Sequence, residues 1–82
     1  MGKMFVAGAL TVDGKVWTSI SDKEEEVRSA ISRWNRSEYL LWNSPSPLEL
    51  KAEQSQIPFI EKEVIESIRK NDRLLKEDII LK

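Results

Sequence analysis

The hydrophobic and polar positions of residues 4–20, MFVAGALTVDGKVWTSI, predict a β-hairpin. Asp13 and Gly14 stand between two apolar stretches, and both residue types tolerate the positive φ angles that a two-residue type I′ turn requires. A loop of those two residues sets the pairing of the strands: Val12 with Lys15, Leu10 with Trp17, and Ala7 with Ile20.

This register assigns the side chains to the two faces of the hairpin. Leu10 and Trp17 share one face, because directly opposed residues of an antiparallel pair point the same way. The other face carries Phe5, Ala7, Ala9, Val16 and Ile20. The first strand is therefore apolar on both faces, which is typical of a central strand.

A helix is predicted over residues 22–35. Ser21 and Glu24 match a capping box, in which each side chain accepts a hydrogen bond from the other residue's backbone N–H. Acidic residues fill the first turn, and Arg33 and Arg36 stand near the last, as the helix dipole favours. The apolar residues recur at i, i+3, i+4 and i+7 and form one stripe, namely Val27, Ala30, Ile31 and Trp34.

The middle of the chain contains one predicted strand and one predicted turn. EYLLWN (38–43) is short and apolar on both sides, as expected for a strand. SPSP (44–47) is predicted to be a turn, because the residue before each proline is pushed toward extended geometry. A connection of four residues is ordinary within one domain and too short to separate two domains.

Residues 48–53, LELKAE, fit two structures equally well. Leu48, Leu50 and Ala52 alternate with charged residues, as in a half-buried strand. SPLE (46–49) is also a good helix start, with Ser46 as the cap and Pro47 at the first helical position. The sequence leaves both structures open.

A second helix is predicted from about residue 58 to residue 70. Asn71 and Asp72 mark its end. Its apolar stripe consists of Ile60, Val64, Ile65 and Ile68. The last apolar run, DIIL (78–81), fits either a terminal strand or an extension of this helix.

These elements predict a small single domain of the α+β class over residues 1–82. We expect an antiparallel sheet of three to four strands packed against two helices, or three helices if 48–53 is helical. The composition, 40% apolar and 33% charged, is that of a soluble folded domain. No apolar run reaches the roughly 20 residues of a membrane helix. We therefore expect a cytoplasmic protein with no membrane contact.

The composition also excludes several classes of function. The chain contains neither cysteine nor histidine, which removes disulfides, thiolate nucleophiles, Cys or His zinc sites and the commonest general base. Nothing in it resembles a phosphate-binding glycine loop, a nucleophile elbow or a metal signature. We expect a protein that is not an enzyme and that uses no metal and no cofactor.

Aromatic residues near strand ends are the leading candidates for a protein-binding site. Trp17 and Trp42 lie on predicted strands near turns, and Tyr39 lies near the start of the predicted strand at 38–43. Tryptophan and tyrosine are enriched among the residues that dominate protein interfaces. The competing interpretation is that the tryptophans fill the core, which is what we expect of Trp34 on the helical stripe.

Basic residues at the two helix ends are the candidates for a nucleic-acid-binding site. RWNR (33–36) interleaves Arg33 and Arg36 with an aromatic residue, as a base-stacking and phosphate-contacting patch would, and Arg69 and Arg73 form a second group. Charge complementing the helix dipoles explains both groups without a ligand. The net charge of −1 also disfavours nucleic acid, because phosphate binding is mainly electrostatic.

The sequence thus predicts a small binding or adaptor protein that acts through protein–protein contacts. Its partner is a second protein or another copy of itself, and an exposed sheet edge is one route to a homodimer. The alternative is a nucleic-acid-binding regulatory protein that uses Arg33, Arg36, Arg69 and Arg73.

Overall fold

The longest strand, β1 (Lys3–Thr11), forms the centre of the fold. The computed structural model describes residues 2–81. After β1 come β2 (Val16–Ser21), α1 (Glu24–Asn35), β3 (Leu40–Asn43), β4 (Leu48–Lys51) and α2 (Ile57–Asn71), with short 3₁₀ turns at Gln54–Gln56 and Lys76–Asp78. The predicted α+β class, an antiparallel sheet of four strands with two helices, is confirmed.

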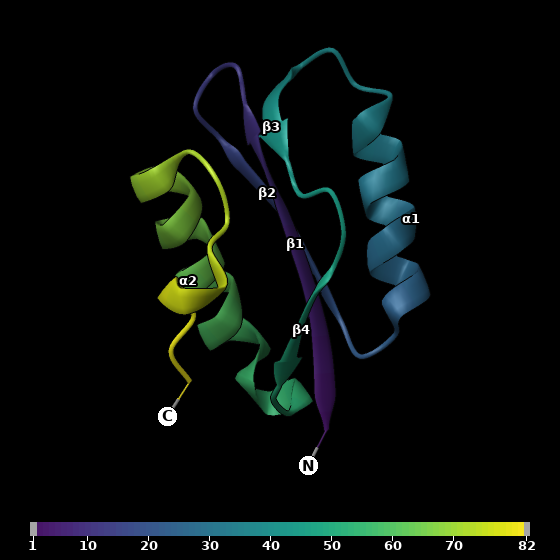
Figure 1. Cartoon of the computed structure of the whole chain (residues 1–82), viewed down its shortest axis with the longest axis vertical. Helices are drawn as coiled ribbons and strands as arrows, with labels where there is room; N and C mark the ends of the chain where they lie inside the picture. The colour runs from purple at the N-terminus through teal and green to yellow at the C-terminus, as the bar shows by residue number, and fades with distance from the viewer. Residues whose placement is uncertain (1, 82) are drawn as a thin grey trace.

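Both edges of β1 are paired. β2 runs antiparallel along one edge, and β3 and β4 both run antiparallel along the other. Ala9 pairs with Asn43 and Val6 with Leu48, so the four SPSP residues (44–47) span only two residues of β1. The SPSP segment therefore interrupts a single edge of the sheet (Figure 1).

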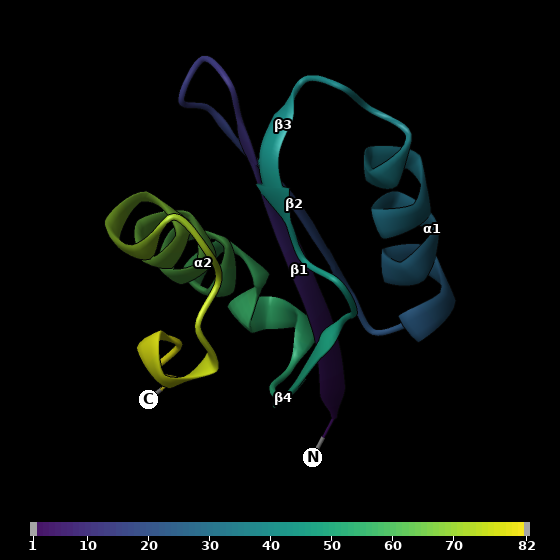
Figure 2. The same cartoon turned by 45° about the horizontal axis from the view of Figure 1, so that its top comes forward.

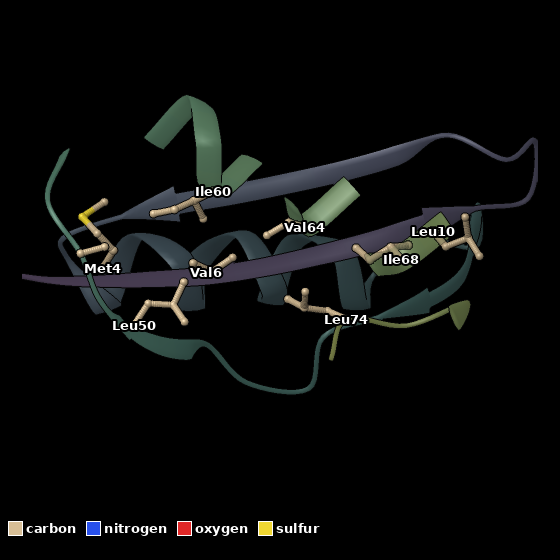
Figure 3. Packing of buried hydrophobic residues seen from close by; sticks show 9 residues of the cluster. Met4, Val6, Leu10, Leu50, Ile60, Val64, Ile68 and Leu74 are labelled. Carbon is tan, nitrogen blue, oxygen red and sulfur yellow. The ribbon is translucent and has the colours of Figure 1, made fainter. Parts of the chain in front are cut away.

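The two helices cover opposite faces of the sheet (Figures 1 and 2). Side chains of β1 alternate between them, so that Phe5, Ala7 and Ala9 face α1 while Met4, Val6 and Leu10 face α2. The α1 side is completed by the predicted stripe of that helix, and the α2 side by Leu50, Ile60, Val64, Ile68 and Leu74 (Figure 3). β1 is apolar on both faces because a helix packs on each.

The hairpin loop has three residues, 12–14, where the sequence predicted two. Thr11 N–H donates to Lys15 O (2.8 Å), and Lys15 N–H donates to the Thr11 hydroxyl (2.8 Å), so the strands close at this pair. Gly14 has a positive φ of 84°, whereas Asp13 does not, which rules out the predicted type I′ turn.

The longer loop makes the predicted hairpin register wrong by one residue. Ala9 pairs with Trp17 and Leu10 with Val16. Trp17 consequently faces α1, while Val16 and Ile20 pack on the α2 side. This is the opposite of the predicted assignment, because a shift of one residue exchanges the two faces of a strand.

α1 begins at Glu24, two residues later than predicted, and ends at Asn35 as predicted. Ser21 stays in β2 opposite Phe5, and its hydroxyl accepts a hydrogen bond from Lys23 N–H (3.0 Å). The predicted capping box between Ser21 and Glu24 is therefore not formed. The four residues of the apolar stripe are all buried.

The ambiguous segment after the SPSP residues is a strand. Leu50 pairs with Met4 of β1 and lies in the core. α2 begins at Ile57, and Asp72 ends it in the left-handed conformation (φ 60°). The DIIL run is neither a strand nor an extension of α2, since only its Asp78 belongs to a 3₁₀ turn.

Candidate functional site

Three aromatic side chains form a row on the α1 side of the sheet. The rings of Trp34 and Trp17 are tilted by 46° with centroids 6.5 Å apart, and those of Trp17 and Tyr39 are stacked, 23° and 6.4 Å apart. Trp34 is buried, Trp17 is half-buried, and 47% of Tyr39 is exposed. The row therefore leads from the core to the surface.

Tyr39 lies against the hairpin because the chain before β3 is held there by its backbone. Val12 N–H donates to Tyr39 O (2.9 Å), and Thr11 pairs with Leu40 at the end of β1. The hairpin loop and the segment before β3 thus lie side by side at one end of the molecule (Figure 1). The Tyr39 ring then rests on Trp17 of β2.

A β-bulge exposes a further apolar residue at this end. Thr11 pairs with Leu40 but Leu10 pairs with Trp42, which leaves Leu41 without an opposing residue. Its side chain is 66% exposed, and that of Val12 in the hairpin loop is 51% exposed. We refer to Val12, Tyr39 and Leu41 as the tip patch.

Hydrogen bonds at the tip patch shift two pKa values. The Thr11 hydroxyl donates to the Asp13 carboxylate, and this bond, with smaller contributions from Tyr39 and Lys15, lowers the pKa of Asp13 from its usual 3.8. The neighbouring Asp13 carboxylate, through hydrogen bonding and its negative charge, raises the pKa of Tyr39 from 10.0. At neutral pH an ionised carboxylate therefore borders the apolar residues.

The three predicted protein-binding aromatics do not share one surface. Trp17 and Tyr39 are stacked, whereas Trp42 packs against the core on the α2 side. Leu40 packs on the α1 side. Residues two apart in a regular strand share a face, so the bulge at Leu41 is what separates Leu40 from Trp42.

Sequence reasoning missed two of the three tip-patch residues. Val12 precedes the Asp-Gly turn, and an apolar residue beside a turn is a signal that could have identified it. Leu41 offered no such signal, because its exposure depends on a bulge that forms only when β3 pairs with β1.

The candidate nucleic-acid-binding arginines lie on two separate helices. Arg33 and Arg36 are at the end of α1 and Arg69 is at the end of α2, with Arg73 just beyond it. These helices lie on opposite sides of the sheet (Figure 2). The arginine at position 28, on the exposed face of α1, is already paired with Glu24 (2.6 Å). The fold therefore does not gather the two basic groups on one helix face.

Among residues 2–81, no cluster of acidic side chains is arranged to hold a metal ion. A surface hollow lies at the far end of β1, beside Lys3, Asp22 and Glu53. Asp22 accepts a hydrogen bond from Gln54 (3.0 Å), and Glu53 accepts one from Gly2 N–H (2.9 Å). These carboxylates hold neighbouring chain segments together.

The helices formed by the described part of the chain are too short or too polar to cross a membrane. Comparisons with protein-family models, with curated proteins and with solved structures found no match to this chain. The tip patch and its surroundings therefore provide the basis for a functional proposal.

Proposed function

We propose that this protein is a small non-enzymatic binding protein whose tip patch docks on an apolar surface of a partner protein. The observation that carries the proposal is the exposure of Val12, Tyr39 and Leu41 at one end of the sheet. Large apolar side chains gathered on a protein surface are a common mark of an interaction site.

Tyr39 of the tip patch is also held in place before any partner binds. Tyr39 is fixed by its stack on Trp17 and by the backbone hydrogen bond from Val12. An aromatic residue that is already ordered loses little conformational entropy on binding, which is why such residues contribute strongly to affinity. The Asp13 carboxylate beside it would give the contact a polar rim.

The test is affinity co-purification of the tagged protein from a lysate of its own host, with and without nuclease. A Leu41→Ser variant removes the most exposed apolar residue of the tip patch and leaves the core untouched. The matched control is Ile80→Ser, because Ile80 is 60% exposed in another part of the chain. We expect a stoichiometric partner to bind the unchanged protein and the Ile80 variant and to be lost from the Leu41 variant.

Two results would contradict the proposal. One is equal recovery of the partner by the Leu41 and Ile80 variants when both are folded by circular dichroism. The other is recovery that disappears after nuclease treatment, which would instead favour nucleic-acid binding by Arg33, Arg36, Arg69 and Arg73.

A further inference from the structure

The two edges of the sheet differ in how they are protected from pairing with another strand. The edge formed by β3 and β4 contains a bulge, the prolines Pro45 and Pro47, and the charged residues Glu49 and Lys51. Bulges, prolines and charges are the features by which natural proteins block edge pairing. β2 is six residues long, VWTSIS, and has no proline, no charge and no bulge.

The backbone of β2 presents free hydrogen-bonding groups on its outer side. Thr11 and Lys15 form a hydrogen-bonded pair, and the register continues without interruption to Phe5 opposite Ser21. Along an antiparallel pair, the backbone N–H and C=O groups of alternate residues point toward the partner strand. Trp17, Ser19 and Ser21 therefore form their backbone hydrogen bonds with β1. Val16, Thr18 and Ile20 therefore direct their N–H and C=O groups outward.

α2 reaches one face of β2, where the Thr18 hydroxyl donates to Glu61 (3.4 Å), but no strand within residues 2–81 pairs with the outer backbone edge of β2. β2 is the last strand of the sheet. All six of its side chains are partly exposed although a helix lies over each face. The edge is therefore accessible to another extended strand.

We propose that β2 pairs antiparallel with β2 of a second copy of this chain, with Thr18 on the two-fold axis. This is the one register in which all three outward-facing residues have a partner in the second copy. Val16 pairs with Ile20, Thr18 pairs with Thr18, and Ile20 pairs with Val16. This register forms roughly six backbone hydrogen bonds, two for each hydrogen-bonded pair of an antiparallel ladder. The two sheets then become one continuous sheet.

The side chains brought together by this register are complementary. Val16 and Ile20 already pack on the α2 side, so each would meet an apolar neighbour there, and Thr18 would meet a hydroxyl. In this register Lys15 of one copy lies opposite Ser21 of the other, so the paired strands do not place two like charges opposite each other.

The dimer gives the molecule two tip patches that point in opposite directions, because the two-fold axis reverses one hairpin relative to the other. This inference rests on the edge of β2 and does not require that the tip patch binds anything. A result that contradicts the β2 dimer therefore leaves the proposed binding by the tip patch untouched, and the reverse is also true.

Single cysteines test the register, because the chain has no cysteine of its own. Thr18→Cys places two thiols next to each other at the axis. Ser46→Cys is the matched control, because Ser46 is exposed on the opposite edge. With a short thiol-reactive crosslinker, we expect most of the Thr18 variant and little of the Ser46 variant to become covalent dimer. Equal crosslinking of the two variants would overturn the proposal.

Sedimentation equilibrium tests the dimer without crosslinking. We expect the unchanged protein to have twice the mass of the chain, with a Kd of about 1 μM or lower. Thr18→Pro removes an outward N–H that β1 does not use, and we expect it to weaken the dimer at least about tenfold. The tip-patch variant Leu41→Ser should remain dimeric. A monomeric unchanged protein at concentrations well above that Kd would refute the dimer, whether or not the tip patch binds a partner.

Discussion

At the scale of single residues, Ser44 supplies the hydrogen bonds that a partner strand would otherwise make with β1 where the sheet edge is interrupted. Its hydroxyl accepts a hydrogen bond from Gly8 N–H (3.0 Å) and donates one to Gly8 O (3.1 Å), and Ser44 N–H also donates to Gly8 O (2.9 Å). Ser44 is 3% exposed, so water does not replace these bonds. Ser44 thus provides hydrogen-bond partners for the N–H and C=O groups of Gly8, in the part of β1 between the segments paired with β3 and β4.

Ser44→Ala is therefore expected to lower the free energy of unfolding by about 1–3 kcal/mol, the cost of leaving a buried donor without a partner. Urea unfolding followed by circular dichroism measures this change. Ser46→Ala provides the control, because Ser46 also precedes a proline but is exposed, and its effect should stay within about 0.5 kcal/mol. Similar losses for the two variants would mean that the Ser44 hydroxyl does not support β1.

At the scale of elements, the contact between the hairpin loop and the segment before β3 can be followed through Tyr39, the only tyrosine in the chain. The neighbouring Asp13 carboxylate, through hydrogen bonding and its negative charge, raises the pKa of Tyr39 above 10.0. Asp13→Asn removes the negative charge, and we expect the tyrosinate absorbance to titrate closer to 10.0. Asp22→Asn, at the far end of β2, should leave this titration unchanged.

The direction of both pKa shifts fixes how this contact depends on pH. The pKa of Tyr39 is raised in the folded protein, so its contribution to stability is complete below pH 10.0 and is lost as the pH rises through the shifted value. The pKa of Asp13 is lowered, so its contribution is complete above pH 3.8 and is lost on acidification through the shifted value. Titration of Tyr39 at its ordinary pKa in the unchanged protein would contradict the contact.

The same elements explain how far sequence reasoning could go. Local periodicity was enough to predict the stripe of α1 and the end of α2, because each depends on neighbours within a few residues. The hairpin register depended on whether Thr11 or Val12 closes the loop, and the Asp-Gly signal does not distinguish them. The Trp17–Tyr39 stack follows from that register and from a bulge in β3, so it could not be predicted locally.

At the scale of the whole molecule, the segment after α2 closes the core on that side. Leu74 is 9% exposed and packs with residues of both helix and sheet (Figure 3). Ser67 ties this segment to α2, since its hydroxyl donates to Asp78 (2.9 Å) and accepts from Leu75 N–H (3.0 Å). A chain of 82 residues has a small core, so each buried side chain makes up a large share of its stability.

Leu74 and Ile80 both belong to the segment after α2 and are both apolar, but they differ in burial. Alanine substitutions at the two positions therefore distinguish the effect of packing on stability from that of apolar character alone. Leu74→Ala should reduce the free energy of unfolding by about 2–5 kcal/mol, because it leaves a cavity against the α2-side core. Ile80→Ala removes a side chain that is 60% exposed and should change stability by no more than about 0.5 kcal/mol. Urea unfolding of both variants measures the difference. A small effect of Leu74→Ala would mean that residues after α2 are not part of the cooperative core, and that α2 and the sheet alone account for the stability of the fold.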